Sequence, residues 1–300
     1  MTLLGDAATF AAGAAALILG GEILVRGAVA LAGRLGVSRL FIGLTVVAFG
    51  TSAPELALNL AAALNGHPQI SFGNIIGSNI ANIGLILGLS ALLRPLVVQA
   101  SLIRRELPLM LAATAGLIAL AVAPPGAVVG GRTIAALSRL DAAALLTGFA
   151  GFLWMAARSL RRGAEGVLQA EIEEVMHSTP SMRLGGAWAL TLVGLALLAG
   201  GGKLAETGAV GLAVGLGVSQ AFVGLTIVAV STSLPELAAS LSAMRKGHSD
   251  IAVGNVVGSN LFNILLIMGL TAMVEPTTLP PGAWRALLAM AVLSAALVPI

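Results

Sequence analysis

GTSAPELALNLAAALNGHPQISFGNIIGSN, residues 50–79, recurs 181 positions later as STSLPELAASLSAMRKGHSDIAVGNVVGSN, residues 231–260. The match runs without a gap over residues 43–90 and 224–271, where about 27 of 48 positions are identical. It continues upstream, where GGEILVRGAVALAGRLGVS (20–38) aligns with GGKLAETGAVGLAVGLGVS (201–219). A match of this length predicts an internal duplication that covers most of the chain.

The composition is that of a membrane protein. Of the 300 residues, 58% are hydrophobic and 10% are charged, whereas soluble domains carry roughly 25% charged residues. The lipid bilayer is therefore an expected partner. Nucleic acid is not, because no basic patch is interleaved with aromatic residues. The chain has no cysteine, so it forms no disulfide.

Hydropathy divides the chain into membrane spans, each of which needs about 20 mainly apolar residues. Glycine is abundant within them, as expected where membrane helices pack closely. Nine spans are predicted, at about 5–31, 40–64, 70–92, 105–123, 137–157, 185–212, 221–244, 251–273 and 284–300.

Basic residues in short loops predict the orientation, because cytoplasmic loops are enriched in Lys and Arg. With the N-terminus outside, the outer loops hold only Arg132, Arg139 and Arg285. We therefore expect an integral protein of the cell (inner) membrane with residues 158–183 in the cytoplasm. The cytoplasmic side then holds Arg34, Arg39, Arg94, Arg104, Arg105, Arg158, Arg161, Arg162, Arg183, Arg245 and Lys246.

The offset of the duplication spans five predicted helices, an odd number. Equivalent helices must therefore cross the membrane in opposite directions, as in many alternating-access transporters. The expected fold is an all-α polytopic membrane protein with two inverted five-helix repeats. Residues 1–160 form the first half, 161–183 a cytoplasmic linker and 184–300 the second half. Only nine spans are visible, so we expect either that the protein lacks the tenth helix or that the sequence is truncated.

Each repeat places a glutamate, Glu55 or Glu236, directly after a proline inside a span. A charge in the bilayer costs several kcal/mol, which makes such a carboxylate functional by default. The proline frees carbonyls about one turn earlier, around Gly50 and Thr51 or around Ser231 and Thr232. The carbonyls of Ala48 and Ala229 are further candidates. Together with neighbouring hydroxyls these are hard oxygen ligands, which suit Na⁺ and Ca²⁺ better than copper or zinc. The hydroxyls are those of Thr51, Ser52, Thr232 and Ser233.

A second motif, GNIIGSNIANI (73–83), recurs as GNVVGSNLFNI (254–264). Helical spacing puts three of its polar residues near one face. In the alternative interpretation these residues only join helices to one another. Two carboxylates would balance one Ca²⁺, two Na⁺ or two protons, which gives a physical basis for exchange. The polar residues of the two copies are Asn74, Ser78 and Asn82, and Asn255, Ser259 and Asn263.

Other charged residues in the spans are expected to be structural. Glu22 and Arg26 are four positions apart, and Lys203 and Glu206 are three apart, which are the spacings of ion pairs within a helix. His67 and His248 occupy equivalent turns, where a structural role is favoured over pH sensing.

The paired motifs resemble the α-repeats of the cation/calcium exchanger superfamily, most closely its prokaryotic sodium/calcium exchanger branch. The resemblance covers essentially the whole chain. It implies a ten-helix fold, no enzymatic activity, no cofactor, and electrogenic exchange of Na⁺ for Ca²⁺. The family's ion ligands would fall on Ala48, Thr51, Ser52, Glu55, Ser78, Asn82, Ala229, Thr232, Ser233, Glu236, Ser259 and Asn263.

Two further expectations come from this resemblance. The spans that contain Glu22 and Lys203 resemble a long tilted pair thought to slide during switching. Some relatives have Asp at the position of Asn263, where an acid is associated with K⁺ dependence. The asparagine of this chain therefore disfavours K⁺ co-transport.

Three other functions are considered. A H⁺/Ca²⁺ antiporter would use the same carboxylates to carry protons, and a cation channel could line its pore with them. An intramembrane hydrolase would use Ser52 or Ser233, but the histidines that could serve as base lie at span ends or in a loop. Na⁺/Ca²⁺ exchange is the function that the sequence favours.

Overall fold

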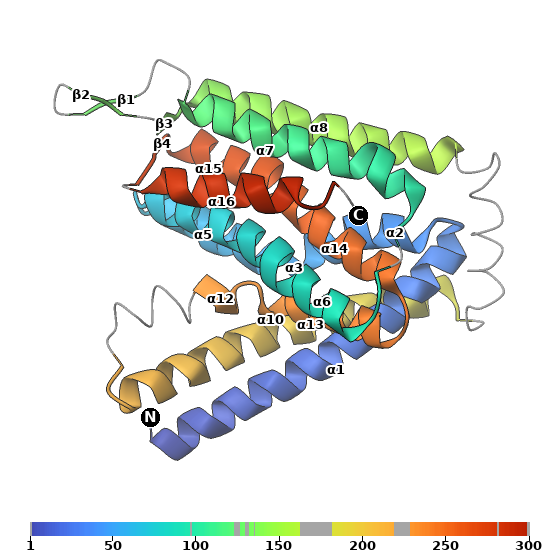
Figure 1. The fold of residues 1–300 in the computed structure, drawn as a ribbon. Coiled ribbons are helices and arrows are strands. Elements are labelled where there is room, and N and C mark those ends of the chain that lie inside the picture. Colours follow the sequence, from blue (N-terminus) through green and yellow to red (C-terminus); the bar gives the residue numbers. More distant parts are fainter. Residues whose placement is uncertain are drawn as a thin grey trace.

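A computed structural model describes residues 2–96, 98–122, 127–129, 132–134, 136–162, 182–218, 229–280 and 282–298. Helices dominate the first half (Figure 1). They are α1 (Leu3–Leu35), α2 (Arg39–Ile42), α3 (Ala48–Thr51), α4 (Ala53–Leu64), α5 (Pro68–Ala81), α6 (Gly88–Leu93), α7 (Leu107–Val122) and α8 (Arg139–Arg162). Wider π-helical turns join some of them, namely η1 (Gly43–Val47), η2 (Asn82–Leu87) and η3 (Leu102–Glu106).

The second half repeats this order with nearly the same offset as the sequence. Helix α4 and its equivalent both have 12 residues and begin 181 positions apart. Even the turns are repeated, since Gly36 and Gly217 both adopt positive φ, at 64° and 84°. The elements are α10 (Leu184–Gly215), α12 (Ala229–Ser231), α13 (Leu234–Arg245), α14 (Ser249–Leu261), η5 (Phe262–Ile267), α15 (Met268–Val274) and α16 (Ala283–Ala295).

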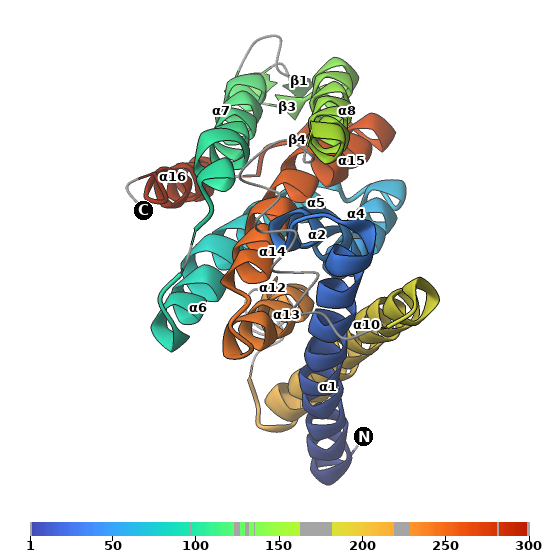
Figure 2. The same cartoon turned by 90° about the vertical axis from the view of Figure 1, so that its right-hand side faces the viewer.

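Helices α1 and α10 lie together on the side of the molecule opposite α7 and α8 (Figures 1 and 2). They are antiparallel, because Gly13 of α1 contacts Ala205 whereas Gly27, further along α1, contacts Thr191. A glycine recurs every seven residues, or about two turns, on each helix. A Cβ added at any of them would lie within 2.9 Å of the other helix. These glycines are Gly13, Gly20 and Gly27 of α1 and Gly194, Gly201 and Gly208 of α10.

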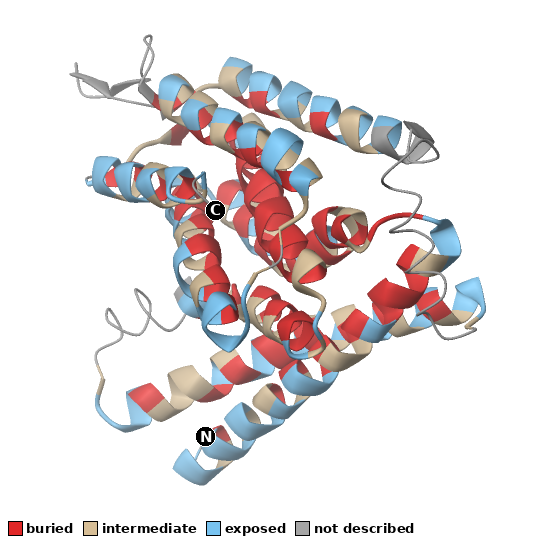
Figure 3. Cartoon of the chain, turned by 45° about the vertical axis from the view of Figure 1, so that its right-hand side comes forward, coloured by how far each residue is buried: buried red, intermediate tan, exposed pale blue. Residues whose placement is uncertain are grey.

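The buried centre of the fold is α14 with η5 (Figure 3). In the segment Ser249–Val274, 94% of the most apolar window is buried, against 50% in the equivalent segment Pro68–Leu93. The segment Ser249–Val274 is covered in addition by α8. Gly269 of α15 lies against Leu146 of α8, and Gly148 of α8 lies against Leu265 of η5. Glycines also let η1 approach α14 closely, because a Cβ on Gly258 would lie 2.6 Å from the Leu44 carbonyl oxygen.

The described helices lie at the positions of the predicted spans, except that residues 221–228 of the span predicted at 221–244 lie outside the described residues. The helix in the span predicted at 284–300, α16, has only 13 residues. The span predicted at 40–64 is bent by 44° between Thr51 and Ala53, and five described helices, or six with this bent pair, are long and apolar enough to cross a membrane. Four short strands lie outside the spans, where β1 (Ala127–Val129) pairs with β2 (Arg132–Ile134) and β3 (Ala136–Leu137) with β4 (Thr277–Thr278).

Two other expectations concern the charged segments. Of the predicted linker at 161–183, residues 163–181 lie outside the described residues, and the structure describes only 161, 162, 182 and 183. Lys203 and Glu206 form the expected ion pair, with 3.0 Å between Nζ and Oε2. The pair predicted between Glu22 and Arg26, both of which the structure describes, does not form. Helical spacing permits such a pair but does not require it.

Candidate ion-binding site

Each repeat breaks its second helix at a serine. Ser52 has φ −84° and ψ 0°, and its equivalent, Ser233, has φ −92° and ψ 5°. Pro54 and Pro235 then occupy the first turn of α4 and α13, where a missing N–H leaves no helical hydrogen bond unmade. The proline therefore starts a new helix rather than kinking an existing one.

These breaks place both glutamates in the first turn of a helix. Glu55 is 1% exposed and Glu236 is fully buried. The N-terminal end of a helix carries a partial positive charge and favours a carboxylate. The fold thus offers each acid a favourable electrostatic position deep in an apolar protein, and the two acids come from opposite halves.

The two predicted carbonyl ligands, those of Ala48 and Ala229, are not described equally by the structure. The Ala48 carbonyl accepts hydrogen bonds from the Ser52 N–H at 3.0 Å and from the Thr51 hydroxyl at 3.3 Å. The Thr51 hydroxyl has a single proton, which it shares between this carbonyl and Asn255 Oδ1, so only the Ser52 N–H engages the Ala48 oxygen fully. Ala229 begins α12, and its side chain lies outside the described residues.

The hydroxyls of one half are held by the polar residues of the other. Thr51 donates to Asn255 Oδ1 at 3.2 Å, and in the equivalent contact Asn74 donates to Thr232 at 3.2 Å. The serines repeat this pattern, with 3.1 Å between Ser52 and Ser259 and 3.1 Å between Ser78 and Ser233. The two motifs that recur in the sequence therefore meet across the pseudo-twofold axis.

Asparagines add a further layer that the sequence prediction only partly included. Asn82 donates to Asn260 Oδ1 at 3.0 Å, and Asn263 donates to Asn79 Oδ1 at 3.2 Å. Asn79 and Asn260 were not predicted as site residues, although both stand in the repeated GSN triplet. Asn59, also not predicted, orients Asn74 through a hydrogen bond of 2.8 Å.

Six buried oxygens at this centre accept no hydrogen bond from the described residues. They are Glu55 Oε1 and Oε2, Glu236 Oε2, Asn59 Oδ1, Asn82 Oδ1 and Asn263 Oδ1. Burying an acceptor without a partner is costly, and the cost is greatest for carboxylates. Carboxylate and amide oxygens are the ligands of Na⁺ and Ca²⁺, so the set fits a hard cation. Among the described residues no three His, Cys, Asp or Glu side chains come together, so most of the ligands available to a cation here are neutral oxygens.

Comparisons with known proteins agree with this geometry. The sodium/calcium exchanger protein family matches residues 6–158 and 186–300. The sodium/calcium exchanger MaX1 of Methanosarcina acetivorans is 33% identical over 281 residues, which cover 87% of this chain and 80% of that protein. This chain belongs to the sodium/calcium exchanger protein family.

The chain is also similar to a bacterial inner membrane protein and to a sodium-calcium exchanger of known structure. The inner membrane protein YrbG of Escherichia coli is 36% identical over 278 residues, or 89% of this chain and 79% of that protein. A structure of the sodium-calcium exchanger NCX_Mj superimposes with a TM-score of 0.79 at 27% identity, covering 99% of this chain and 91% of that one. The protein is accordingly a membrane antiporter of Ca²⁺ and another cation, and not an enzyme.

An antiporter needs a path to its site, and cavities mark one in this exchanger. A cavity of about 140 Å³ lies between α4, α10 and α13, and its lining includes Pro54, Pro235 and Thr232. A second cavity, of about 320 Å³, lies beside it and reaches Phe10 of α1. Both are large enough for several water molecules.

The equivalent region of the other repeat is closed. A Cβ on Gly21 would lie 2.7 Å from the Ala238 carbonyl oxygen, because α1 packs directly on α13. Its counterpart, Gly202, has Pro235 as its neighbour at an ordinary 3.4 Å. Within the residues that the structure describes, which leave out 219–228, we therefore call the cavity side the open side and the side where α1 packs on α13 the closed side.

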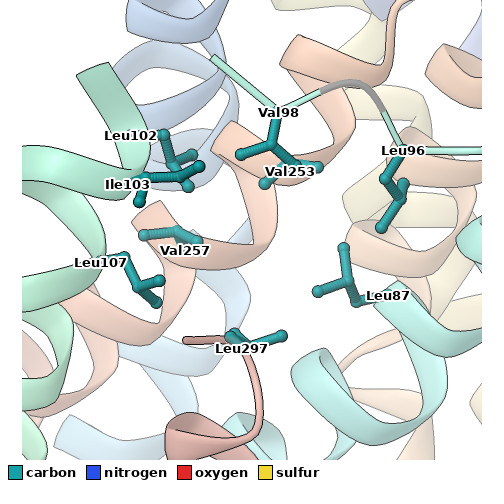
Figure 4. A pocket seen from close by; sticks show the side chains of 9 residues that line it. All are labelled: Leu87, Leu96, Val98, Leu102, Ile103, Leu107, Val253, Val257 and Leu297. Atoms are coloured by element: carbon teal, nitrogen blue, oxygen red, sulfur yellow. The ribbon is translucent and has the colours of Figure 1, made fainter. Parts of the chain in front are cut away.

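A third cavity, of about 30 Å³, is lined only by apolar side chains (Figure 4). Leu107 of α7, Val257 of α14 and Leu96, from the loop after α6, face it. It offers no oxygen ligand, so it is not part of an ion path.

Proposed function

We propose that this chain exchanges Na⁺ for Ca²⁺ by alternating access, with Glu55 and Glu236 as the principal Ca²⁺ ligands. The supporting observation is the group of buried oxygens that accept no hydrogen bond from the described residues. Two carboxylates neutralise one Ca²⁺, and the neutral oxygens complete a hard coordination shell. The full proposed ligand set is Glu55, Glu236, Thr51, Ser52, Thr232, Ser233, Ala48, Ala229, Ser78, Ser259, Asn82 and Asn263.

Sodium is favoured over the proton by the neutral part of this set. A proton needs only a carboxylate, whereas Na⁺ also takes hydroxyl and carbonyl oxygens. Thr51, Ser52 and Ser233 are at most 3% exposed, and each is aligned by a residue of the opposite half. Proton-coupled exchange would leave this arrangement of hydroxyls without a role.

We further propose that the N-terminus is outside the cell membrane and that residues 158–183 are cytoplasmic, joining halves at 1–160 and 184–300. The basic loop residues support this orientation. The open side, near Lys203, then faces outward. A single cysteine at Glu171 should resist an impermeant thiol reagent in intact cells, because the chain has no cysteine of its own. Strong labelling from outside would reverse the orientation.

The decisive experiment is uptake of radioactive Ca²⁺ into proteoliposomes. In the absence of K⁺, an outward Na⁺ gradient at equal pH on both sides should drive Ca²⁺ accumulation. Uptake driven only by a pH gradient would support the H⁺/Ca²⁺ antiporter. Currents far above transporter turnover would instead indicate a channel.

A further inference from the structure

The two cavities on the open side share a charged residue that the transport site does not use. Glu206 of α10 lines both of them, and its side chain is 22% exposed. The smaller cavity continues from Glu206 to Thr232, one of the proposed ligands. A cation that enters from this side therefore passes the Glu206 carboxylate before it reaches the paired glutamates.

The same carboxylate already holds a cation that belongs to the chain. Lys203 Nζ lies 3.0 Å from Glu206 Oε2, and the lysine side chain is 73% exposed. Exposed ion pairs of this kind are weak and exchange readily. A mobile cation can therefore displace the ammonium group, and the ammonium group can displace the cation.

The internal repeat indicates that this pair is not required by the fold. The positions equivalent to Lys203 and Glu206 in the first half are Glu22 and Val25. Val25 is 1% exposed and lies on the closed side. The lysine–glutamate pair thus belongs to one access path only.

We propose that Glu206 is a recruiting site for the transported cations on the open side, and that Lys203 is a tethered competitor for it. This inference rests on the proposed function, because it assigns a role in delivering ions to the same central site. A carboxylate at the mouth of a low-dielectric cleft raises the local cation concentration. The neighbouring ammonium group lowers that effect, so the pair adjusts the apparent affinity from one face without altering the central ligands.

The test measures the KM for Ca²⁺ separately from each membrane face, in right-side-out and inside-out vesicles. Glu206→Gln should raise the KM several-fold from the open side, and Lys203→Met should lower it several-fold. The double variant should behave like Glu206→Gln, because the lysine acts through the glutamate. All three should keep a normal maximal rate. Glu275→Gln serves as control, since Glu275 is an exposed acid that lines neither cavity.

An unchanged KM in Glu206→Gln with normal exchange would overturn the proposal. Equal shifts from both faces would also overturn it, because they would indicate a general change in the protein. An unchanged KM in Lys203→Met would remove the competitor role.

A second measurement does not depend on transport and so separates this inference from the proposed function. Lys203→Cys should react faster with a cationic thiol reagent than with an anionic one, and Ca²⁺ should slow the cationic reagent. Adding Glu206→Gln should abolish both effects. Equal rates for the two reagents with Glu206 present would overturn the recruiting role, whether or not Na⁺ drives exchange.

Discussion

Ser52 and Glu236 are 184 positions apart in the sequence and are joined by a hydrogen bond of 3.0 Å, in which the serine donates to Oε1. The equivalent bond, from Ser233 to Glu55, is not formed between these two described residues. Ser233 contacts Ser78 instead, and both Glu55 oxygens lack a partner in the described structure. The two glutamates therefore occupy equivalent positions in the two repeats but have different hydrogen-bond partners in this conformation.

Replacing either glutamate by glutamine should nearly abolish Ca²⁺ transport. The amide keeps an oxygen but loses the charge that offsets the dehydration of Ca²⁺. We expect Glu55→Gln and Glu236→Gln each to lower uptake by about a hundredfold or more, which corresponds to about 3 kcal/mol or more. Glu22→Gln should have a much smaller effect in the same proteoliposome assay. Near-normal exchange in both site variants, with failure of the Glu22 variant, would move the site elsewhere.

Removal of the threonine hydroxyls should weaken the dependence on Na⁺ more than the binding of Ca²⁺. Thr51→Val and Thr232→Val keep the shape of the side chain but remove an oxygen that contacts Asn255 or Asn74. The Na⁺ concentration that gives half-maximal exchange should therefore rise several-fold, which a Na⁺ titration of Ca²⁺ efflux would measure. Unaltered Na⁺ dependence in both variants would favour protons as the counter-ion.

The amide of Asn263 supplies a donor that an ionised carboxylate cannot. Its Nδ2 donates to Ser78 Oγ and to Asn79 Oδ1, both at 3.2 Å. In Asn263→Asp a carboxylate would face these oxygens, at a cost of about 1–3 kcal/mol in stability for each acceptor left unpaired. Exchange at neutral pH should fall and partly recover at acidic pH, where a protonated Asp regains one donor. A variant that exchanges normally at neutral pH would show that these two bonds are dispensable.

Gly202 should be needed for the opposite conformation. If the two repeats exchange their arrangements, Gly202 will approach Ala57 as closely as Gly21 now approaches Ala238. Gly202→Ala fits the present conformation and should slow exchange by holding the protein in it. Leu58 lines the open cavity, so Leu58→Cys can report on access to it. An impermeant thiol reagent should label Leu58→Cys more strongly when Gly202→Ala is also present than when Gly202 is unchanged. The matched control is Gly21→Ala, for which labelling should decrease.

The stability of the folded protein should decrease at acidic pH because of His248. Partial burial, then the positive charges of Arg39 and Lys246, lower the pKa of His248 to about 4, from its ordinary 6.5. The folded protein thus resists protonation that the unfolded chain accepts, and the stability contributed by neutral His248 is lost as pH falls from about 6.5 toward 4. His248→Gln should flatten thermal stability between these pH values. An identical pH profile in wild type and variant would assign the effect to other groups.

The sequence predicted the duplication, its inverted sense and most of the helices, because the offset and the hydropathy depend only on residue order. It also brought Thr51, Glu55 and Ser78 together with their equivalents, since the same motifs recur twice. It did not predict that Pro54 would start a helix, because the conformation of Ser52 depends on packing against α14. Asn79 was missed because helical spacing places it off the face of Ser78. Its contact with Asn263 depends on how the two halves meet.

The glycine contacts between α1 and α10 have a mechanical consequence. An apolar helix of 33 residues is about 50 Å long, whereas the hydrocarbon layer is about 30 Å thick. The excess length favours a helix that is strongly tilted from the membrane normal, and the close glycine contacts couple the tilt of one helix to that of the other. We expect a thicker bilayer to bring the pair nearer to upright and a thinner one to lay it flatter. The rate of exchange should therefore depend on lipid chain length, through the tilt of the α1–α10 pair.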